Sequence, residues 1–141
     1  MIMYESTRGS KEKLNAAQAV IKGIAEDKGL FVPDSIPKLP VELKDLAGKS
    51  YQEIAKMIIG AFFQDYTEEE IQHCVVHAYD EKFAAEEIVP MAKIGGQVPM
   101  YILELYHGKT AAFKDMALSI LPYLLTTAMK KENEEKRRKG N

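Results

Sequence analysis

The sequence predicts a mixed α/β fold with α+β character, in which a helix-rich domain carries a small sheet. Two segments begin with capping pairs, Ser50 with Glu53 and Thr67 with Glu70, and apolar residues follow each pair at helical spacing. The run from Met100 to Tyr106 is instead apolar and rich in β-forming residues, which is typical of a strand. Since 141 residues suffice for one domain with its own core, we expect residues 1–141 to form a single domain.

Composition and charge narrow the classes of function. The formal net charge is −2, whereas a nucleic-acid or membrane-surface binder would show a clustered basic excess, so we expect neither partner. A single cysteine, Cys74, excludes an internal disulfide framework and fits a reducing compartment. The first residues show no secretory signal pattern, and the longest mostly apolar stretch, Leu118 to Met129, is too short to cross a bilayer. We therefore expect a cytoplasmic protein.

The segment from Tyr4 to Ser10 has the composition of a loop rich in hydrogen-bond donors. One interpretation is an anion-binding loop in which Arg8 helps to hold a substrate phosphate. The other is a solvated amino-terminal arm, which composition alone favours.

A first helix is expected from the capping residue Asn15 to a point before Gly29, with four apolar positions at Ala17, Val20, Ile21 and Ile24. Leu30 to Val32 is then a short extended piece. The prolines that follow, at 33, 37 and 40, indicate an irregular connection with no site.

The two capped helices that follow are joined by a short link, which predicts an αα-hairpin with its apolar stripes in the core. His73 and His77 lie four residues apart on the second of them. The zinc pattern of this spacing requires a glutamate where Cys74 stands, and no third ligand is near in sequence. We therefore predict no metal site there.

The second half begins with two apolar extended runs, Ile88–Ile94 and Met100–Tyr106, joined through Gly95-Gly96 as a hairpin. The second run is apolar on both faces apart from Glu104, so we predict a buried central strand. The carboxylate of Glu104 then needs a partner, for which Arg8 or a nearby lysine is a candidate.

A long helix is predicted after Thr110, because apolar residues recur at helical spacing from Met116 to Met129. Pro122 in its interior predicts a kink. Residues 130–141 are almost wholly charged, which is typical of a solvated helix end that frays.

Lys114 occupies an unusual place, in the predicted first turn of this helix and directly after Phe113. The positive end of a helix disfavours a nearby ammonium group. The same field, together with partial burial against Phe113, favours the neutral amine, which is the nucleophilic form.

At these residues the sequence resembles a known family. The segment Leu103–Asp115, which contains His107-Gly108-Lys109-Thr110 and Phe113-Lys114-Asp115, closely resembles the lysine segment of threonine synthases. Three further segments match the family in the same order: Tyr4-x-Ser6-Thr7-Arg8-Gly9, Gly29-Leu30-Phe31-Val32-Pro33 and Ser50-Tyr51-x-Glu53. The resemblance covers nearly the whole chain, and four ordered matches make it specific. It departs locally at Lys109, where the family usually has proline, and at Ala111, where a leucine is common.

The resemblance implies a pyridoxal-phosphate enzyme of the tryptophan-synthase-β-like fold type, of which this chain is the amino-terminal portion. It implies that Lys114 is the catalytic residue and carries the cofactor as a Schiff base, with Phe113 and Asp115 as further cofactor-binding residues. The implied substrate is a small phosphorylated amino acid, O-phosphohomoserine, which reacts with water to give threonine and phosphate in threonine biosynthesis. The implied substrate-binding residues are Ser6, Thr7, Arg8, His107 and Thr110.

The sequence has no Gly-rich phosphate cradle, and in the family that role falls to a loop after the lysine helix. We therefore expect residues 1–141 to be inactive alone, and apolar surface near Tyr101–Tyr106 to favour self-association. Two alternatives remain open. One is a phospholyase-like relative acting on a different phosphorylated amino acid, and the other is a non-catalytic interaction domain, which a gene ending at Asn141 would support.

Overall fold

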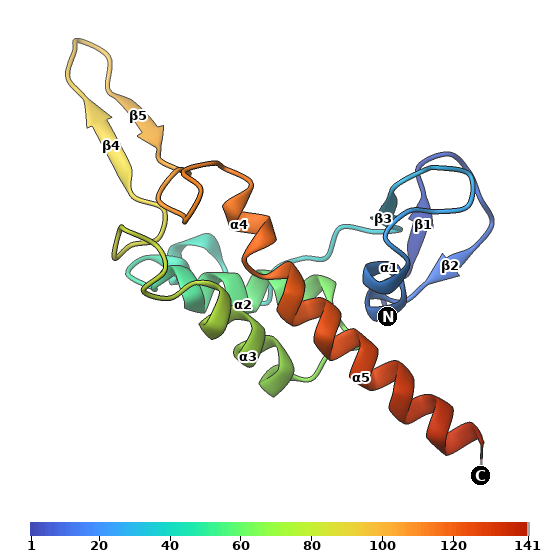
Figure 1. Ribbon diagram of the computed structural model, residues 1–141. Helices are drawn as coiled ribbons and strands as arrows, with labels where there is room; N and C mark the ends of the chain where they lie inside the picture. Colours follow the sequence, from blue (N-terminus) through green and yellow to red (C-terminus); the bar gives the residue numbers. More distant parts are fainter. Residues whose placement is uncertain (141) are drawn as a thin grey trace.

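Four helices form the centre of the molecule, with a small sheet at one end and a projecting hairpin at the other (Figure 1). The computed structural model describes residues 1–140. The central helices are α1 (Ala16–Lys22), α2 (Tyr51–Phe62), α3 (Glu68–Ala78) and α5 (Leu121–Lys139). The mixed, helix-rich fold class expected from the sequence is confirmed. Among residues 1–140, no helix combines the length and the apolar character that crossing a membrane requires.

The amino-terminal sheet has three antiparallel strands in the order β2-β1-β3. They are β1 (Tyr4–Ser6), β2 (Lys13–Leu14) and β3 (Phe31–Pro33). Tyr4 pairs with Leu14 on one side and with Pro33 on the other. The sequence predicted the extended piece at β3 but assigned residues 4–6 to a loop, which is wrong. Three residues are too few for a periodic pattern, and the partners of β1 are distant in sequence.

The first helix begins where the sequence predicted and ends earlier. Asn15 caps α1, and its side chain accepts a hydrogen bond of 2.8 Å from the backbone N–H of Gln18. The helix stops at Lys22 because Gly23 adopts a positive φ of 72°. Ile24, predicted on the buried face, is exposed and forms a bridge with Leu30 instead.

The two capping boxes predicted from the sequence are present. The Glu53 carboxylate accepts from the Ser50 N–H at 2.8 Å, and the Glu70 carboxylate accepts from the Thr67 N–H at 2.7 Å. The helices α2 and α3 pack on each other through a short link, so the predicted αα-hairpin is confirmed. The connection before α2 is irregular as expected, apart from one 3-10 turn at Leu43–Leu46.

The core lies where α3 and α5 meet α1 and α2. Small residues permit close packing, since Cys74 and Ala78 of α3 and Ala128 of α5 are completely buried. Burial raises the pKa of the Cys74 thiol. The buried hydroxyl of Tyr66 donates to the backbone carbonyl of Leu124 at 2.9 Å, which ties the α2–α3 link to α5.

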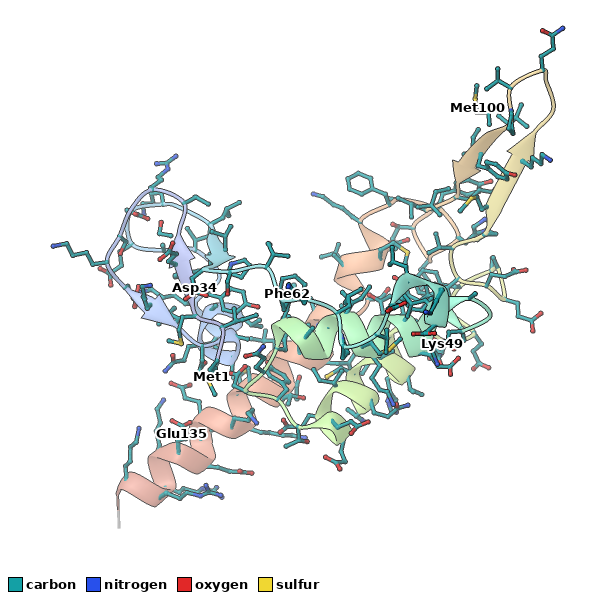
Figure 2. All side chains as sticks on the ribbon, turned by 180° about the vertical axis from the view of Figure 1, so that it is seen from behind. Met1, Asp34, Lys49, Phe62, Met100 and Glu135 are labelled. Atoms are coloured by element: carbon teal, nitrogen blue, oxygen red, sulfur yellow. The ribbon has the colours of Figure 1, made fainter. Side chains whose placement is uncertain are left out.

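The predicted hairpin is confirmed, but its strands are shorter and exposed. Met91 pairs with Leu103 and Ile94 with Met100 in the antiparallel strands β4 (Met91–Ile94) and β5 (Met100–Leu103). All four residues of β5 are exposed, by 47 to 58%. The prediction of a buried central strand is therefore wrong for this chain. In Figure 2, Met100 lies on the hairpin where it projects away from the helices.

The predicted long carboxy-terminal helix is divided into two. A short helix, α4 (Asp115–Leu118), ends before Ser119, and α5 begins at Leu121. Pro122 lies in the first turn of α5, where its missing N–H leaves no helix bond unmade, so the prediction of a kink is wrong. The charged segment continues α5 to Lys139, and the last residue of the predicted tail, Asn141, lies outside the described residues.

Candidate functional site

The backbone after β5 is held by a carboxylate–imidazole pair. The Nε2 atom of His107 lies 2.6 Å from a carboxylate oxygen of Glu104. The sequence predicted Arg8 or a lysine as the partner of Glu104, and this prediction is wrong, because its partner is His107. His107 also accepts a hydrogen bond of 2.9 Å from the Ala84 N–H through its backbone carbonyl, so the segment is anchored to the loop before β4.

A compact loop connects Gly108 to Asp115. Asp115 is only 6% exposed, and its carboxylate accepts two hydrogen bonds from Thr110, one from the backbone N–H at 2.8 Å and one from the hydroxyl at 2.6 Å. These two bonds lower the pKa of Asp115, because they stabilise its charged form. Between the partners, Ala111 adopts a positive φ of 55° and its N–H donates to the Gly108 carbonyl at 3.0 Å.

Lys114 lies at the end of this loop, one residue before α4. Its backbone carbonyl accepts from the N–H groups of Ala117 and Leu118 at 3.1 and 2.9 Å. Its side chain is exposed, and Phe113 beside it is 68% exposed. The expectation that Lys114 lies inside the first turn, partly buried against Phe113, is therefore wrong. The helix that follows, α4, is one turn long.

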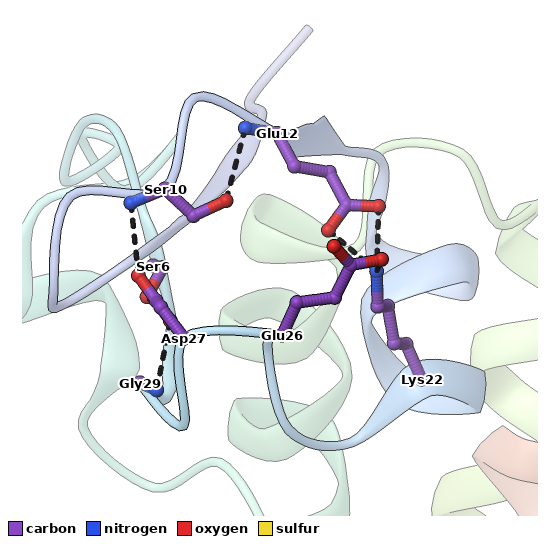
Figure 3. A network of polar contacts seen from close by, with 7 residues as sticks. All are labelled: Ser6, Ser10, Glu12, Lys22, Glu26, Asp27 and Gly29. Atoms are coloured by element: carbon purple, nitrogen blue, oxygen red, sulfur yellow. Dashed lines mark hydrogen bonds and ion pairs between the residues drawn. The ribbon is translucent and has the colours of Figure 1, made fainter.

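The amino-terminal loop is a second polar cluster, built around Asp27 (Figure 3). The Asp27 carboxylate accepts from the Ser6 hydroxyl at 2.6 Å and from the N–H groups of Ser10 and Gly29 at 2.9 Å each. The Ser6 hydroxyl, then the Gly29 N–H, are the main causes that lower the pKa of Asp27. The Ser6 oxygen also accepts from the Arg8 N–H at 3.1 Å.

The side chains of Ser6, Thr7 and Arg8 differ in the hydrogen bonds that they already form within the loop. The Thr7 hydroxyl accepts from the Leu30 N–H at 3.0 Å, and the Ser6 hydroxyl is held by Asp27. The Arg8 guanidinium is exposed and makes one long contact, 3.4 Å, with the Asp27 carbonyl. Arg8 is therefore the residue of this loop that offers free charged donors.

Five of the predicted site residues lie in one continuous segment: His107, Thr110, Phe113, Lys114 and Asp115. The other three, Ser6, Thr7 and Arg8, lie in the amino-terminal loop, which the fold does not place beside that segment. Figure 1 shows the sheet that carries the amino-terminal loop well separated from α4 and the hairpin. Asp27, the organising residue of that loop, is not among the site residues predicted from the sequence. Its signal is the Asp27-Lys28-Gly29 turn, where Lys28 has a positive φ of 66°.

Other groups in the described residues do not extend this site. Among residues 1–140, no three His, Cys, Asp or Glu side chains form a cluster able to hold a metal ion. His73 and His77 interact with each other, since Nδ1 of His77 lies 2.8 Å from the His73 carbonyl. A groove of about 530 Å³ lies between the proline-containing connection and the α2–α3 pair, away from Lys114.

The fold has a close counterpart among solved structures. A PLP-bound threonine synthase from Brucella melitensis superposes on this chain with a TM-score of 0.85 and 30% sequence identity. The match covers 94% of this chain and 28% of that protein. The architecture is therefore that of one region of a larger pyridoxal-phosphate fold.

The sequence comparisons give the family. The family model described as "Threonine synthase N terminus" matches residues 3–79, and the chain belongs to the threonine synthase family. Threonine synthase from Eremothecium gossypii is 36% identical over 140 residues, covering 94% of this chain and 27% of the relative. Threonine synthase-like 1 from Homo sapiens is 38% identical over 112 residues, covering 77% of this chain and 15% of the relative. The chain thus spans about a quarter or less of the length of these relatives.

Proposed function

We propose that this chain is the amino-terminal part of a pyridoxal-phosphate-dependent threonine synthase, which converts O-phosphohomoserine and water to threonine and phosphate. The observation that carries the proposal is the position of Lys114. Its side chain projects freely from a loop that is fixed on both sides, in a fold shared with a PLP-bound relative over 94% of the chain.

The residues around Lys114 fit an aldehyde cofactor. Among residues 1–140, the Lys114 amine has no ion-pair or hydrogen-bond partner that would compete for it. Phe113 offers an exposed aromatic face beside it. In this proposal Lys114 is the covalent attachment point for the cofactor. Phe113 and Asp115 are further residues of the cofactor-binding site. The cofactor supplies an electron sink, while the protein supplies orientation and proton transfer.

The roles proposed for the protein groups follow from their chemistry. The Lys114 amine, once free, holds and moves a proton at the substrate carbon skeleton. The guanidinium of Arg8 is suited to a substrate phosphate, because its planar donors match phosphate oxygens in pairs. His107 and Thr110 lie in the same segment of the chain as Lys114, and we include them in the proposed substrate-binding set with Ser6 and Thr7. This set requires the amino-terminal loop and the Lys114 segment to face one substrate in the complete enzyme.

The exposed apolar residues of the hairpin are consistent with a chain that is part of a longer enzyme. We propose that the apolar face of β4 and β5 is covered by the remainder of the enzyme, since the relatives are roughly four to five times as long as this chain. Without this cover the isolated chain self-associates through the same face. The sequence also contains no Gly-rich phosphate cradle, so we propose that residues 1–141 alone neither retain the cofactor specifically nor turn over substrate.

A second candidate keeps the family and changes the reaction. This candidate is a phospholyase-like relative that acts on another phosphorylated amino acid, and release of phosphate from such a substrate would identify it. The third candidate is a non-catalytic interaction domain, for which the exposed hairpin is the relevant surface. Reading the gene beyond codon 141 separates this third candidate from the other two.

The test uses the protein at the full length that its gene encodes, loaded with pyridoxal phosphate. We expect release of phosphate and threonine from O-phosphohomoserine over many turnovers. Lys114→Ala and Lys114→Arg should both abolish turnover, because a guanidinium stays protonated and cannot replace the amine. Lys109→Ala is the matched control, since Lys109 is an exposed lysine of the same loop and should be dispensable.

Three results would contradict the proposal. Multiple turnover by Lys114→Ala would remove the role of the lysine. Release of phosphate from a different phosphorylated amino acid, with none from O-phosphohomoserine, would favour the phospholyase candidate. Pyridoxal phosphate that stays on the 141-residue chain through dialysis, and is lost in Lys114→Ala, would show that these residues contain a complete cofactor site.

A further inference from the structure

The Asp115 carboxylate forms hydrogen bonds within the loop that precedes it, and the proposed function gives these bonds no role. Both of its oxygens are engaged by Thr110: Oδ2 accepts from the backbone N–H and Oδ1 from the hydroxyl. Asp115 is nearly buried, so it points into the loop rather than out of it. The same carboxylate is therefore a brace across the loop that ends in Lys114.

Gly108 shows how tightly the brace is built. A Cβ atom added at Gly108 would lie 2.4 Å from the Asp115 Cβ, 2.9 Å from its Cγ and 2.6 Å from one carboxylate oxygen. The Asp115 side chain thus fills the space that any other residue at position 108 would need. The glycine is required here by this close approach.

The backbone inside the brace is held in an unfavourable conformation. Ala111 has a positive φ of 55°, which costs energy for a residue with a Cβ and persists only where its surroundings enforce it. Ala111 itself is exposed, so packing over its side chain does not enforce this conformation. The conformation is enforced by hydrogen bonds on either side of Ala111. One runs from Thr110 to Asp115, and the other from the Ala111 N–H to the Gly108 carbonyl.

The brace acts on Lys114 because Asp115 is its chain neighbour. On the other side, the Lys114 carbonyl is fixed by two N–H groups of the α4 turn. The root of the Lys114 side chain is thereby held from both directions, while the side chain itself remains free. An attachment point needs this combination, since the amine must reach its partner from a reproducible position.

We propose that Asp115 and Thr110 are a positioning pair that holds Lys114 for covalent attachment, and that Gly108 is the glycine that admits the pair. The proposal rests on the proposed function for the role of Lys114. Thr110 and Asp115 act through the loop and through each other, as positioning residues. The Asp115 carboxylate is charged near neutral pH, as an aspartate with an ordinary or a lowered pKa is, so both hydrogen bonds are charge-assisted.

The test compares two substitutions at one position in the full-length protein without cofactor. Thr110→Val removes the hydroxyl and keeps the shape, whereas Thr110→Ser keeps the hydroxyl. We expect hydrogen exchange at the amides of residues 110, 115 and 116 to accelerate roughly tenfold or more in Thr110→Val, since a hydrogen bond to a charged group is lost. Thr110→Ser should stay close to wild type. Thr126→Val is the matched control, because it removes a similar hydroxyl bond, to the Pro122 carbonyl in α5.

A second readout follows the lysine itself. The protein is incubated with pyridoxal phosphate, reduced with borohydride, and the labelled lysines are mapped by peptide mass. Wild type and Thr110→Ser should label at Lys114 in preference to Lys109, and Thr110→Val should lose this preference. Gly108→Ala, which displaces Asp115, should behave like Thr110→Val, while Gly95→Ala has open space and should not.

Each outcome decides the proposal. Wild-type exchange in Thr110→Val, or exchange that accelerates equally in α2 and α3, would overturn it, because the bond would then be dispensable or part of global stability. Equal labelling of Lys109 and Lys114 in wild type would overturn the proposed function alone, since the exchange rates are measured without cofactor and test the brace separately.

Discussion

The hydroxyl of Tyr79 donates a hydrogen bond of 2.7 Å to the backbone carbonyl of Met116. Tyr79 directly follows α3 as its C-cap and is almost fully buried in the helical core, whereas Met116 belongs to α4, two residues after Lys114. Burial raises the pKa of Tyr79, so the hydroxyl keeps the proton that it donates. This bond connects the stable helical core to the segment that carries the candidate site.

Removing this hydroxyl should weaken that connection. Tyr79→Phe should lower the free energy of unfolding by about 0.5–1.5 kcal/mol, the usual worth of one hydrogen bond. Urea denaturation at neutral pH measures the effect. Tyr101→Phe is the control, because Tyr101 is exposed on the hairpin. Equal losses in the two variants would contradict a special role for the Tyr79 bond.

A side chain at Gly29 should disrupt the amino-terminal loop. A Cβ there would lie 2.0 Å from the Ser6 hydroxyl oxygen and 3.1 Å from the Arg8 backbone nitrogen, and Ser6 is buried and cannot move aside easily. Gly29→Ala should therefore lower the free energy of unfolding by roughly 1–3 kcal/mol, as overpacking does.

The matched control for this substitution is Gly95→Ala, which meets no atom within 4 Å. Adding Ser6→Ala to Gly29→Ala removes the oxygen that clashes, so the double variant should lose less than the sum of the single variants. Strict additivity in urea denaturation would show that the clash is relieved in another way.

The loop should also respond to acid through Asp27. Because its pKa is lowered in the folded chain, the unfolded chain binds more protons than the folded chain in the acid range, and stability rises with pH there. The contribution of Asp27 is fully present above its ordinary pKa of about 3.9 and is lost as pH falls through the lower folded value.

The measurement compares wild type with Asp27→Asn by urea denaturation from pH 7 downward. The difference in unfolding free energy between them should be constant above pH 5, on the ordinary pKa scale, and shrink as the pH is lowered below about 4. A difference that grows toward acid would have the wrong sign for a carboxylate stabilised by Ser6 and Gly29.

Arg8 should matter to substrate binding in the complete enzyme. Arg8→Ala should lower kcat/KM for O-phosphohomoserine by an amount equivalent to about 1.5–3 kcal/mol, since it removes charged hydrogen bonds to the phosphate. Lys11→Ala is the control, because it removes an exposed cation that follows the loop directly in sequence. If both variants keep wild-type kinetics across a substrate titration, the loop is a solvated arm.

The hairpin should make the 141-residue chain self-associate. Met100 and Ile102 lie on one face of β5, opposite Ile94 and Ala92, so this face is entirely apolar. Replacing both Met100 and Ile102 by lysine should shift the chain toward monomer in sedimentation velocity across a concentration series. Leu43→Lys, at an exposed leucine of the connection, should not. A wild-type chain that is monomeric throughout would contradict the prediction.

The starts of the helices could be predicted from local sequence. Each capping box joins residues three apart, such as Ser50 with Glu53, so all the partners are contained in a short stretch and the starts of α2 and α3 follow from it. The helix start at Asn15 and the hairpin around Gly95-Gly96 are local in the same sense. The resemblance of the segment Leu103–Asp115 to threonine synthases is also local, because it depends on residues that are consecutive in sequence.

Several features that the sequence did not predict depend on distant partners. The strand at Tyr4–Ser6 exists only because Lys13–Leu14 and Phe31–Pro33 lie beside it, and Asp27 organises a loop that begins twenty-one residues earlier, at Ser6. The exposure of β5 is also decided by packing, since an apolar run is buried only where another element covers it. Residue types along the chain thus determined the capped helices and the identity of the lysine loop. Tertiary structure alone decided the exposure of Lys114 and the bracing of its loop by Asp115, because both depend on which atoms surround a side chain in space.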